Sequence, residues 1–175
     1  MRVALVIYKA HSHGQDSVLH ITKKSRYAVR ALIGLSLRKD NGPVPLADLA
    51  RSIDVPFQFL EQIFAQLRRS GIVTAKRGAK GGYMLAIDAD DISVLSIIET
   101  LDGPINPAEC TGESSCGRVS ECSASFVWLE TKKVMEDYLG RETIASLAAH
   151  GAGAASAQED PRSGTGLSSD REATQ

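Results

Sequence analysis

Residues 56–83 read PFQFLEQIFAQLRRSGIVTAKRGAKGGY, and this stretch decides the fold. Its first half places apolar side chains at spacings of 3, 4 and 3, which predicts a helix with one core-facing stripe. Pro56 suits the start of that helix, and Gly71 suits a left-handed cap at its end. The predicted core members of the helix are Phe57, Leu60, Phe64 and Leu67.

Two short strands are predicted after Gly71, over residues 73–76 and 82–86, joined by the basic, glycine-rich segment 77–81. Upstream, apolar periodicity predicts a helix that begins near Thr22 or Ser25 and ends before Gly42, and a short helix over 46–52. Helix, helix, turn, helix and basic hairpin is the order of a winged helix-turn-helix domain.

The second half of the chain predicts further helices around a loop. Short helices are expected over 92–101 and 144–149, and a longer amphipathic helix over 123–139. Between them, residues 105–122 form a loop rich in glycine and serine. The predicted fold is therefore mainly α with a small two-stranded wing.

Four regions follow from this pattern: a flexible N-terminal extension (1–20), a winged helix-turn-helix domain (21–90), a cysteine loop with its helices (91–149) and a disordered tail (150–175). The tail is expected to be disordered because it has almost no bulky apolar residue to offset the entropy of ordering.

Charge divides the chain in the same way. Residues 21–85 carry 12 Lys and Arg against 4 Asp and Glu, whereas residues 86–175 carry 6 against 16. A basic first half is typical of a domain that binds nucleic acid. The sequence has no apolar run long enough to cross a membrane and no secretory signal, so we expect a cytoplasmic protein.

The predicted DNA-binding surface has three parts. Exposed residues at the start of helix 56–70 reach base edges in the major groove, where Gln pairs with adenine, Glu accepts from cytosine and Phe59 meets a thymine methyl. Arg77 in the hairpin suits a narrow minor groove. The basic start of the first helix meets phosphates, assisted by the helix N-terminus. The predicted contacts are Lys23, Lys24, Arg26, Tyr27, Pro56, Gln58, Phe59, Glu61, Gln62, Arg77, Gly78 and Lys80.

All three cysteines, Cys110, Cys116 and Cys122, lie in the loop at C-x5-C-x5-C spacing. Structural zinc sites use tighter pairs and normally four good ligands, whereas an iron–sulfur cluster needs thiolates spread over a larger volume. The spacing therefore favours a cluster as cofactor. A reversible disulfide, a zinc ion with an added His or carboxylate, and free cysteines remain as alternatives. We find no nucleophile–base pair and no phosphate-binding loop, so an enzyme is not expected.

Five segments carry a family resemblance: ITKKSRYAVRAL (21–32), GPVPLADLA (42–50), FLEQIF (59–64), LRRSGIV (67–73) and RGAKGGYML (77–85). Together they resemble the IscR/NsrR-type family of bacterial winged-helix transcription regulators, over about residues 21–149.

This resemblance implies a homodimer that binds palindromic promoter DNA as a repressor or dual regulator and senses iron–sulfur, redox or nitrosative status. It implies a 2Fe–2S or 4Fe–4S cluster on the three cysteines. It also implies that helix 123–139 is a dimerisation helix that pairs with its twin. The side chains expected to face the twin come from Phe126, Trp128, Val134, Met135 and Leu139.

The chain departs from the family pattern at the fourth cluster ligand. The resemblance implies a His at the position of Ser125, or an Asp at the position of Arg26. Candidate fourth ligands are Glu109, Glu121, Ser125, a His within residues 1–20, or a small molecule. Two other functions stay open: a regulator of the same family that uses thiol oxidation or a small metabolite, and a zinc- or cluster-bearing protein-interaction adaptor.

Overall fold

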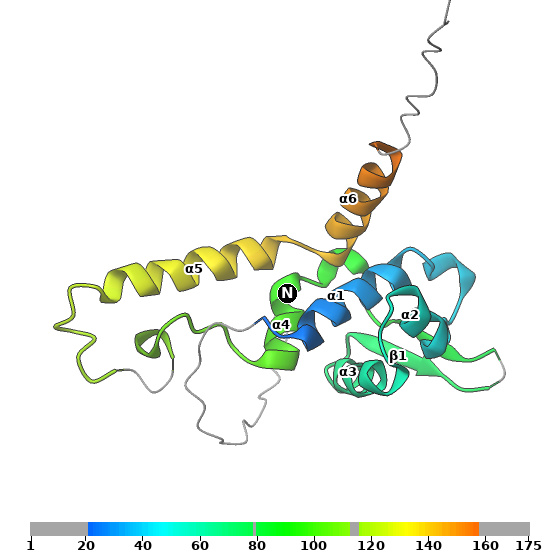
Figure 1. Cartoon of the computed structure of the whole chain (residues 1–175), viewed down its shortest axis with the longest axis horizontal. Helices are drawn as coiled ribbons and strands as arrows, with labels where there is room; N and C mark the ends of the chain where they lie inside the picture. The colour runs from blue at the N-terminus through cyan, green and yellow to red at the C-terminus, as the bar shows by residue number, and fades with distance from the viewer. Residues whose placement is uncertain (1–20, 79, 113–115, 158–175) are drawn as a thin grey trace, which may run out of the picture.

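A computed structural model describes residues 21–78, 80–112 and 116–157 of the chain (Figure 1). The helices and strands are α1 (Lys23–Ser36), α2 (Leu46–Ser52), α3 (Phe57–Arg69), β1 (Val73–Lys76), β2 (Gly82–Leu85), α4 (Val94–Asp102), α5 (Ser125–Arg141) and α6 (Ile144–Ala157). Short 3-10 turns are η1 (Lys39–Asn41), η2 (Ala89–Asp91) and η3 (Glu109–Thr111). The expected winged helix-turn-helix order is confirmed.

The core of the first half lies between α1, α2 and α3. Thr22 caps α1 by accepting a hydrogen bond from the backbone N–H of Lys24, and Gly42 (φ +79°) follows η1 beyond the end of α1. On α3, the expected core residues Leu60, Phe64 and Leu67 are fully buried. Phe57 is not, with 46% of its surface exposed, and Ile63 is buried instead. The prediction for Phe57 was wrong because this first residue of α3 lies beside a shallow surface hollow formed with Ala47 and Val55.

The hairpin pairs β1 with β2 in antiparallel register, Val73 opposite Leu85 and Lys76 opposite Gly82. A third segment joins this sheet, because Val44 and Tyr83 exchange both backbone hydrogen bonds, at 2.9 and 2.8 Å. Tyr83 also packs edge-on against Phe64 of α3, with ring centroids 4.9 Å apart. The base of the wing is thus fixed to the helical core.

The second half extends away from this body. Figure 1 shows α4 beside α1, and α5 running out to the side that lies opposite the hairpin. A backbone bridge fixes the base of α5: Val94 N–H donates to Glu142 C=O (2.8 Å) and Ile144 N–H to Ile92 C=O (2.9 Å). The helix begins two residues later than predicted and continues through Gly140 to Arg141, so the expected end at Leu139 was wrong.

The last helix also differs from the prediction. It extends to Ala157, whereas we expected it to end at Ala149 and a disordered tail to begin at residue 150. Alanine has the highest helix propensity, and seven of the fourteen residues of α6 are alanine, so helix forms there without bulky apolar residues. The expectations for residues 1–20 and 158–175 lie outside the described residues. No helix in the described ranges is long and apolar enough to span a membrane.

Candidate nucleic-acid interface and cysteine loop

The start of α3 presents a polar, solvent-accessible edge. Pro56, Gln58, Glu61 and Gln62 are all exposed there, as expected for side chains that reach base edges. Phe59 differs, because it is half-buried and packs edge-on against Tyr27 of α1, with centroids 6.0 Å apart at 89°. Its ring therefore contributes to the contact between α1 and α3, which limits its availability for a thymine methyl.

One face of α1 continues this edge. Lys23, Lys24 and Arg26 are exposed, and Tyr27 is half-buried beside α3. The guanidinium of Arg30 lies over the Tyr27 ring at 6.0 Å from its centroid. Arg30 was missed by the sequence analysis, although its spacing of seven from Lys23 already placed both on one helix face.

The wing is the third part of the predicted DNA-binding surface. Arg77, Gly78 and Lys80 are exposed at the hairpin tip, and Ala79 lies outside the described residues. Gly78 adopts φ +114°, and its C=O accepts a hydrogen bond from Gly81 N–H at 2.8 Å. This backbone conformation favours glycine.

The cations of these surfaces are not used in internal ion pairs. Among the described residues, the two ion pairs are Arg51–Asp48 and Lys132–Glu136, and neither involves the start of α1, the start of α3 or the wing. Exposed, unpaired Lys and Arg side chains are available to phosphates, which provide most of the affinity for DNA.

The N-terminus of α1 has an acidic neighbour that we did not expect. It is Asp102, the last residue of α4, which hydrogen-bonds to the N-cap residue Thr22. The Asp102 carboxylate accepts from the backbone N–H and the hydroxyl of Thr22 and from the hydroxyl of Ser25. A carboxylate from 80 residues away cannot be recognised from local sequence.

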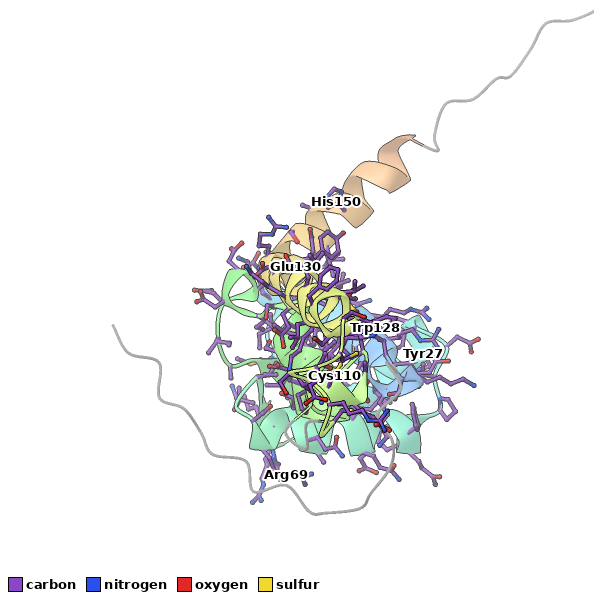
Figure 2. The ribbon with its side chains drawn as sticks, turned by 90° about the vertical axis from the view of Figure 1, so that its left-hand side faces the viewer. Tyr27, Arg69, Cys110, Trp128, Glu130 and His150 are labelled. Carbon is purple, nitrogen blue, oxygen red and sulfur yellow. The ribbon has the colours of Figure 1, made fainter. Side chains whose placement is uncertain are left out.

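The cysteine loop is anchored beneath α5. Lys132 of α5 donates from Nζ to Oδ1 of Asn106 (3.2 Å) and to the C=O of Thr111 (3.0 Å), and it pairs with Glu136 at 3.7 Å. Thr111 is buried and adjoins Cys110 in η3. Figure 2 shows Cys110 below the helix that carries Trp128 and Glu130.

The three cysteines are free thiols of differing exposure. Cys110 and Cys116 are half-buried and Cys122 is exposed. In the described part of the chain, no three His, Cys, Asp or Glu side chains converge closely enough to hold a metal ion. The donor chemistry nevertheless fits an iron–sulfur cluster: three thiols on one loop with no disulfide among them. Gathering these thiols requires the loop to close around its ligand.

The candidates for a fourth ligand differ in availability. Glu109 and Glu121 are exposed. Ser125 is half-buried, and its hydroxyl donates to the C=O of Cys122 at 2.8 Å. This hydrogen bond ties Ser125 to the backbone of the third cysteine at the start of α5. The histidines of residues 1–20 lie outside the described residues.

The pKa of one titratable group near Lys132, which anchors the loop, is shifted. Partial burial raises the pKa of Glu99 on α4, the Glu136 carboxylate raises it further, and the Lys132 ammonium opposes both effects. The contact between α4 and α5 therefore brings together two carboxylates that share one lysine.

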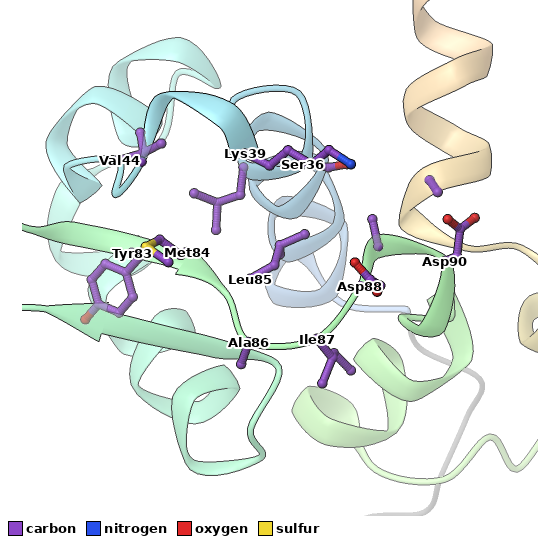
Figure 3. A pocket seen from close by; sticks show the side chains of 14 residues that line it. Ser36, Lys39, Val44, Tyr83, Met84, Leu85, Ala86, Ile87, Asp88 and Asp90 are labelled. Carbon is purple, nitrogen blue, oxygen red and sulfur yellow. The ribbon is translucent and has the colours of Figure 1, made fainter.

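A hollow of about 410 Å³ lies between the end of α1, β2 and the η2 turn (Figure 3). Its walls include Lys39, Asp88 and Asp90, all of them exposed. Among the described residues, the buried side-chain atom without a hydrogen-bond partner is Oε1 of Gln66, which does not line this hollow. We assign no ligand to it.

Known proteins resemble the chain in both sequence and structure. The model of the Rrf2 family, described as "Iron-dependent Transcriptional regulator", matches residues 21–150. The HTH-type transcriptional regulator IscR of Erwinia tasmaniensis is 35% identical over 129 residues, which cover 74% of this chain and 78% of that protein.

Two solved structures share the architecture. CymR (YrzC), the global cysteine regulator of B. subtilis, has a TM-score of 0.64 and 32% identity, over 76% of this chain and 98% of its own. The IscR of T. potens has a TM-score of 0.64 and 32% identity, over 78% of this chain and 90% of its own.

Proposed function

The chain belongs to the Rrf2 family of transcriptional regulators, and on that premise we propose that it binds promoter DNA as a homodimer and senses iron–sulfur, redox or nitrosative status through Cys110, Cys116 and Cys122. It is a DNA-binding transcription regulator with a winged-helix fold, and its relatives are regulators and not enzymes. The homodimer, the cluster and the individual contact residues are the parts we propose.

The observation that supports the contact residues is the joined surface of α1, α3 and the wing. The Tyr27–Phe59 contact links α1 to α3, and the Val44–Tyr83 bridge fixes the wing beside them. We propose that Gln58, Glu61 and Gln62 read base edges in the major groove, with Pro56 and Phe59 beside them. The wing residues Arg77, Gly78 and Lys80 contact the adjacent minor groove, and the phosphate contacts come from Lys23, Lys24, Arg26, Tyr27 and Arg30.

An experiment on Arg77 tests this arrangement. Double-stranded DNA selected by the wild-type protein from a randomised library serves as the probe. Arg77→Ala should weaken binding by about tenfold, since a good base or groove contact is worth about 1–3 kcal/mol. Arg141→Ala, which removes the same charge from the end of α5, should bind like wild type. Equal binding by both variants would exclude the wing from the interface.

The cluster is proposed from the donor set. When bound, an iron–sulfur cluster supplies a redox-active and oxidisable group at the loop. The chain itself contributes three accessible thiols, the anchor of the loop on Lys132 and the polar contacts of Ser125 beside Cys122. A weak fourth ligand makes such a cluster labile, which suits sensing better than a structural role.

Anaerobic purification tests the cluster. The protein should be brown and contain iron and sulfide in near-cluster stoichiometry, and the Cys110→Ser variant should lose both. A colourless protein with stoichiometric zinc would overturn the cluster and favour the zinc alternative. A colourless, metal-free protein whose thiols oxidise reversibly to a disulfide, read by mass spectrometry, would favour the thiol switch instead.

A further inference from the structure

Asp102 joins two segments that are far apart in sequence. Its Oδ2 accepts from the backbone N–H of Thr22 (3.0 Å) and from the Ser25 hydroxyl (2.6 Å), and its Oδ1 accepts from the Thr22 hydroxyl (2.6 Å). Figure 1 shows α1 and α4, which carry these groups, side by side. One carboxylate therefore uses both oxygens to hold the first turn of α1.

These hydrogen bonds determine how α1 begins. Because the Thr22 hydroxyl donates its proton to Asp102, its lone pairs face the backbone N–H of Lys24, which donates to it at 3.1 Å. Asp102 thus orients the N-cap of α1, and its negative charge lies at the positive end of the helix dipole. Ser25 is fully buried, so without Asp102 its hydroxyl is a buried donor that has lost its partner.

Asp102 also marks where the cysteine loop begins. Gly103 follows it with φ +88°, and the chain continues into the segment that carries Cys110 and is held to α5 by Lys132. On the other side of the Asp102 hydrogen bonds lie Lys23, Lys24 and Arg26, three of the proposed phosphate contacts. The carboxylate therefore forms a polar link between the base of the loop and the start of α1.

We propose that Asp102 is a positioning residue for DNA binding, which fixes the first turn of α1 and transmits displacement of the cysteine loop to it. The proposal rests on the proposed function, since it assumes that this turn contacts phosphates. When Asp102 is in place, the lysines of the turn have one fixed backbone from which to reach the DNA. When the loop base moves, the N-cap loses its orientation and the turn frays.

Hydrogen–deuterium exchange of the full-length protein tests the positioning part without DNA. Asp102→Asn keeps the shape but removes the charge and one acceptor oxygen, and it should speed exchange at residues 22–26 by about tenfold, as expected when a helix cap is lost. The matched variant Asp91→Asn changes an exposed carboxylate elsewhere and should leave these amides unchanged. Wild-type exchange at residues 22–26 in Asp102→Asn would overturn the proposal.

Ser25→Ala provides a second variant that keeps the carboxylate and removes one of its three hydrogen bonds. It should accelerate exchange in the same residues to a smaller extent, and its circular dichroism should match wild type. This variant keeps the proposal falsifiable if Asp102→Asn fails to fold. Unchanged exchange in Ser25→Ala, with Asp102→Asn unfolded, would also overturn it.

The transmission part needs a readout that a purely structural role would not move. The affinity for the DNA selected by wild type is measured for four proteins. Two have intact cysteines and two carry the triple substitution Cys110→Ser, Cys116→Ser, Cys122→Ser, and in each pair one protein also carries Asp102→Asn. Asp102→Asn should weaken binding about three- to tenfold, and the effect of the cysteines on affinity should shrink toward none. An equal cysteine effect in both backgrounds would overturn transmission through Asp102.

The outcomes separate this inference from the proposed function. If wild-type protein selects no DNA, the proposed function fails, and with it the role of Asp102 in DNA binding, whatever the exchange data show. If wild-type protein binds DNA but the cysteines do not affect affinity, sensing and transmission fail together. The exchange and affinity of Asp102→Asn then decide whether positioning is correct.

Discussion

Helices α3 and α5 both carry apolar side chains, but only α3 buries any of them fully within the chain. The 13 residues of α3 include four buried apolar side chains, whereas the 17 residues of α5 include no buried residue. Six apolar side chains of α5 are exposed, and Met135 and Leu139 are half-buried; the exposed ones are Phe126, Val127, Trp128, Leu129, Val134 and Tyr138. Of these, Val127, Val134 and Tyr138 share one side of the helix, and an exposed apolar patch of this kind is typical of an interaction site. The two helices therefore differ in how the chain uses them: α3 is part of the core, whereas α5 contacts α4 and η3 on one side and leaves apolar side chains exposed elsewhere.

The largest change in stability should come from a truncated side chain in the core at α3. Phe64→Ala removes a fully buried ring that packs on Tyr83, so we expect the free energy of unfolding to fall by about 3–5 kcal/mol. Chemical denaturation followed by circular dichroism measures it. Phe126→Ala, which truncates a ring that is 68% exposed on α5, serves as the control and should leave unfolding unchanged at a protein concentration where light scattering shows a monomer. Equal losses at that concentration would mean that Phe126 is packed within the chain.

The next effect should appear on α5. Val127, Thr131, Val134 and Tyr138 recur at a spacing of four, three and four, the seam pattern of paired helices. Val134→Asp places a charge in the middle of this seam, and we expect the dissociation constant of the dimer to rise by about 100-fold, or roughly 3 kcal/mol. Light scattering across a concentration series measures the mass. A dimer of undiminished affinity would show that α5 is not the interface.

A smaller effect is expected from Arg30 of α1, which lies over the Tyr27 ring. Arg30→Ala should weaken DNA binding by about fivefold and lower the slope of log affinity against log salt by about one, because one phosphate contact is lost. Lys133→Ala on α5 removes the same charge and should change neither quantity. An unchanged salt slope in Arg30→Ala would place Arg30 outside the interface.

The smallest effect concerns Glu99 of α4, which lies near Lys132 and Glu136 of α5. Because its pKa is raised in the folded chain, the folded state holds this proton more tightly than the unfolded state. The free energy of unfolding should therefore decrease as the pH rises from the ordinary pKa of glutamate through the raised one. Glu99→Gln should flatten this decrease and be slightly more stable at neutral pH. Denaturant unfolding over that range measures both, with exposed Glu130→Gln as the control, and identical profiles for Glu99→Gln and wild type would contradict it.

The elements that local chemistry determines were predicted closely. Helix α2 and strand β1 have the expected bounds, because glycine, proline and short-range periodicity delimit them. Phe57 shows where periodicity fails: a stripe names the residues that share a face, but the neighbouring elements decide which of them are covered. The end of α6 was missed because its alanines favour helix without contributing to a core.

In the candidate site, too, features set by local sequence were predicted and contacts between distant residues were not. The exposed residues in the first turn of α3 and at the wing tip follow from the winged helix-turn-helix motif and were predicted individually. The Asp102–Thr22 and Lys132–Thr111 contacts join residues 80 and 21 positions apart and have no local signature. Val127 and Tyr138 are exposed but were not among the residues expected to face the twin, whereas Met135 and Leu139 were and are half-buried, because the sequence gave no indication of which residues would pack on α4.

The Val44–Tyr83 bridge affects the entropy that the wing loses when it binds DNA. Gly82 lies so close to Val44 that a Cβ there would collide with the Val44 backbone, and both backbone hydrogen bonds close over this contact. The stem of the hairpin is therefore ordered before any encounter with DNA. Fixing the backbone of one residue costs about 1–2 kcal/mol of conformational entropy. Because the stem is already ordered, its residues do not lose this entropy when the wing binds. The stem of the wing should therefore dock on DNA nearly as a rigid body.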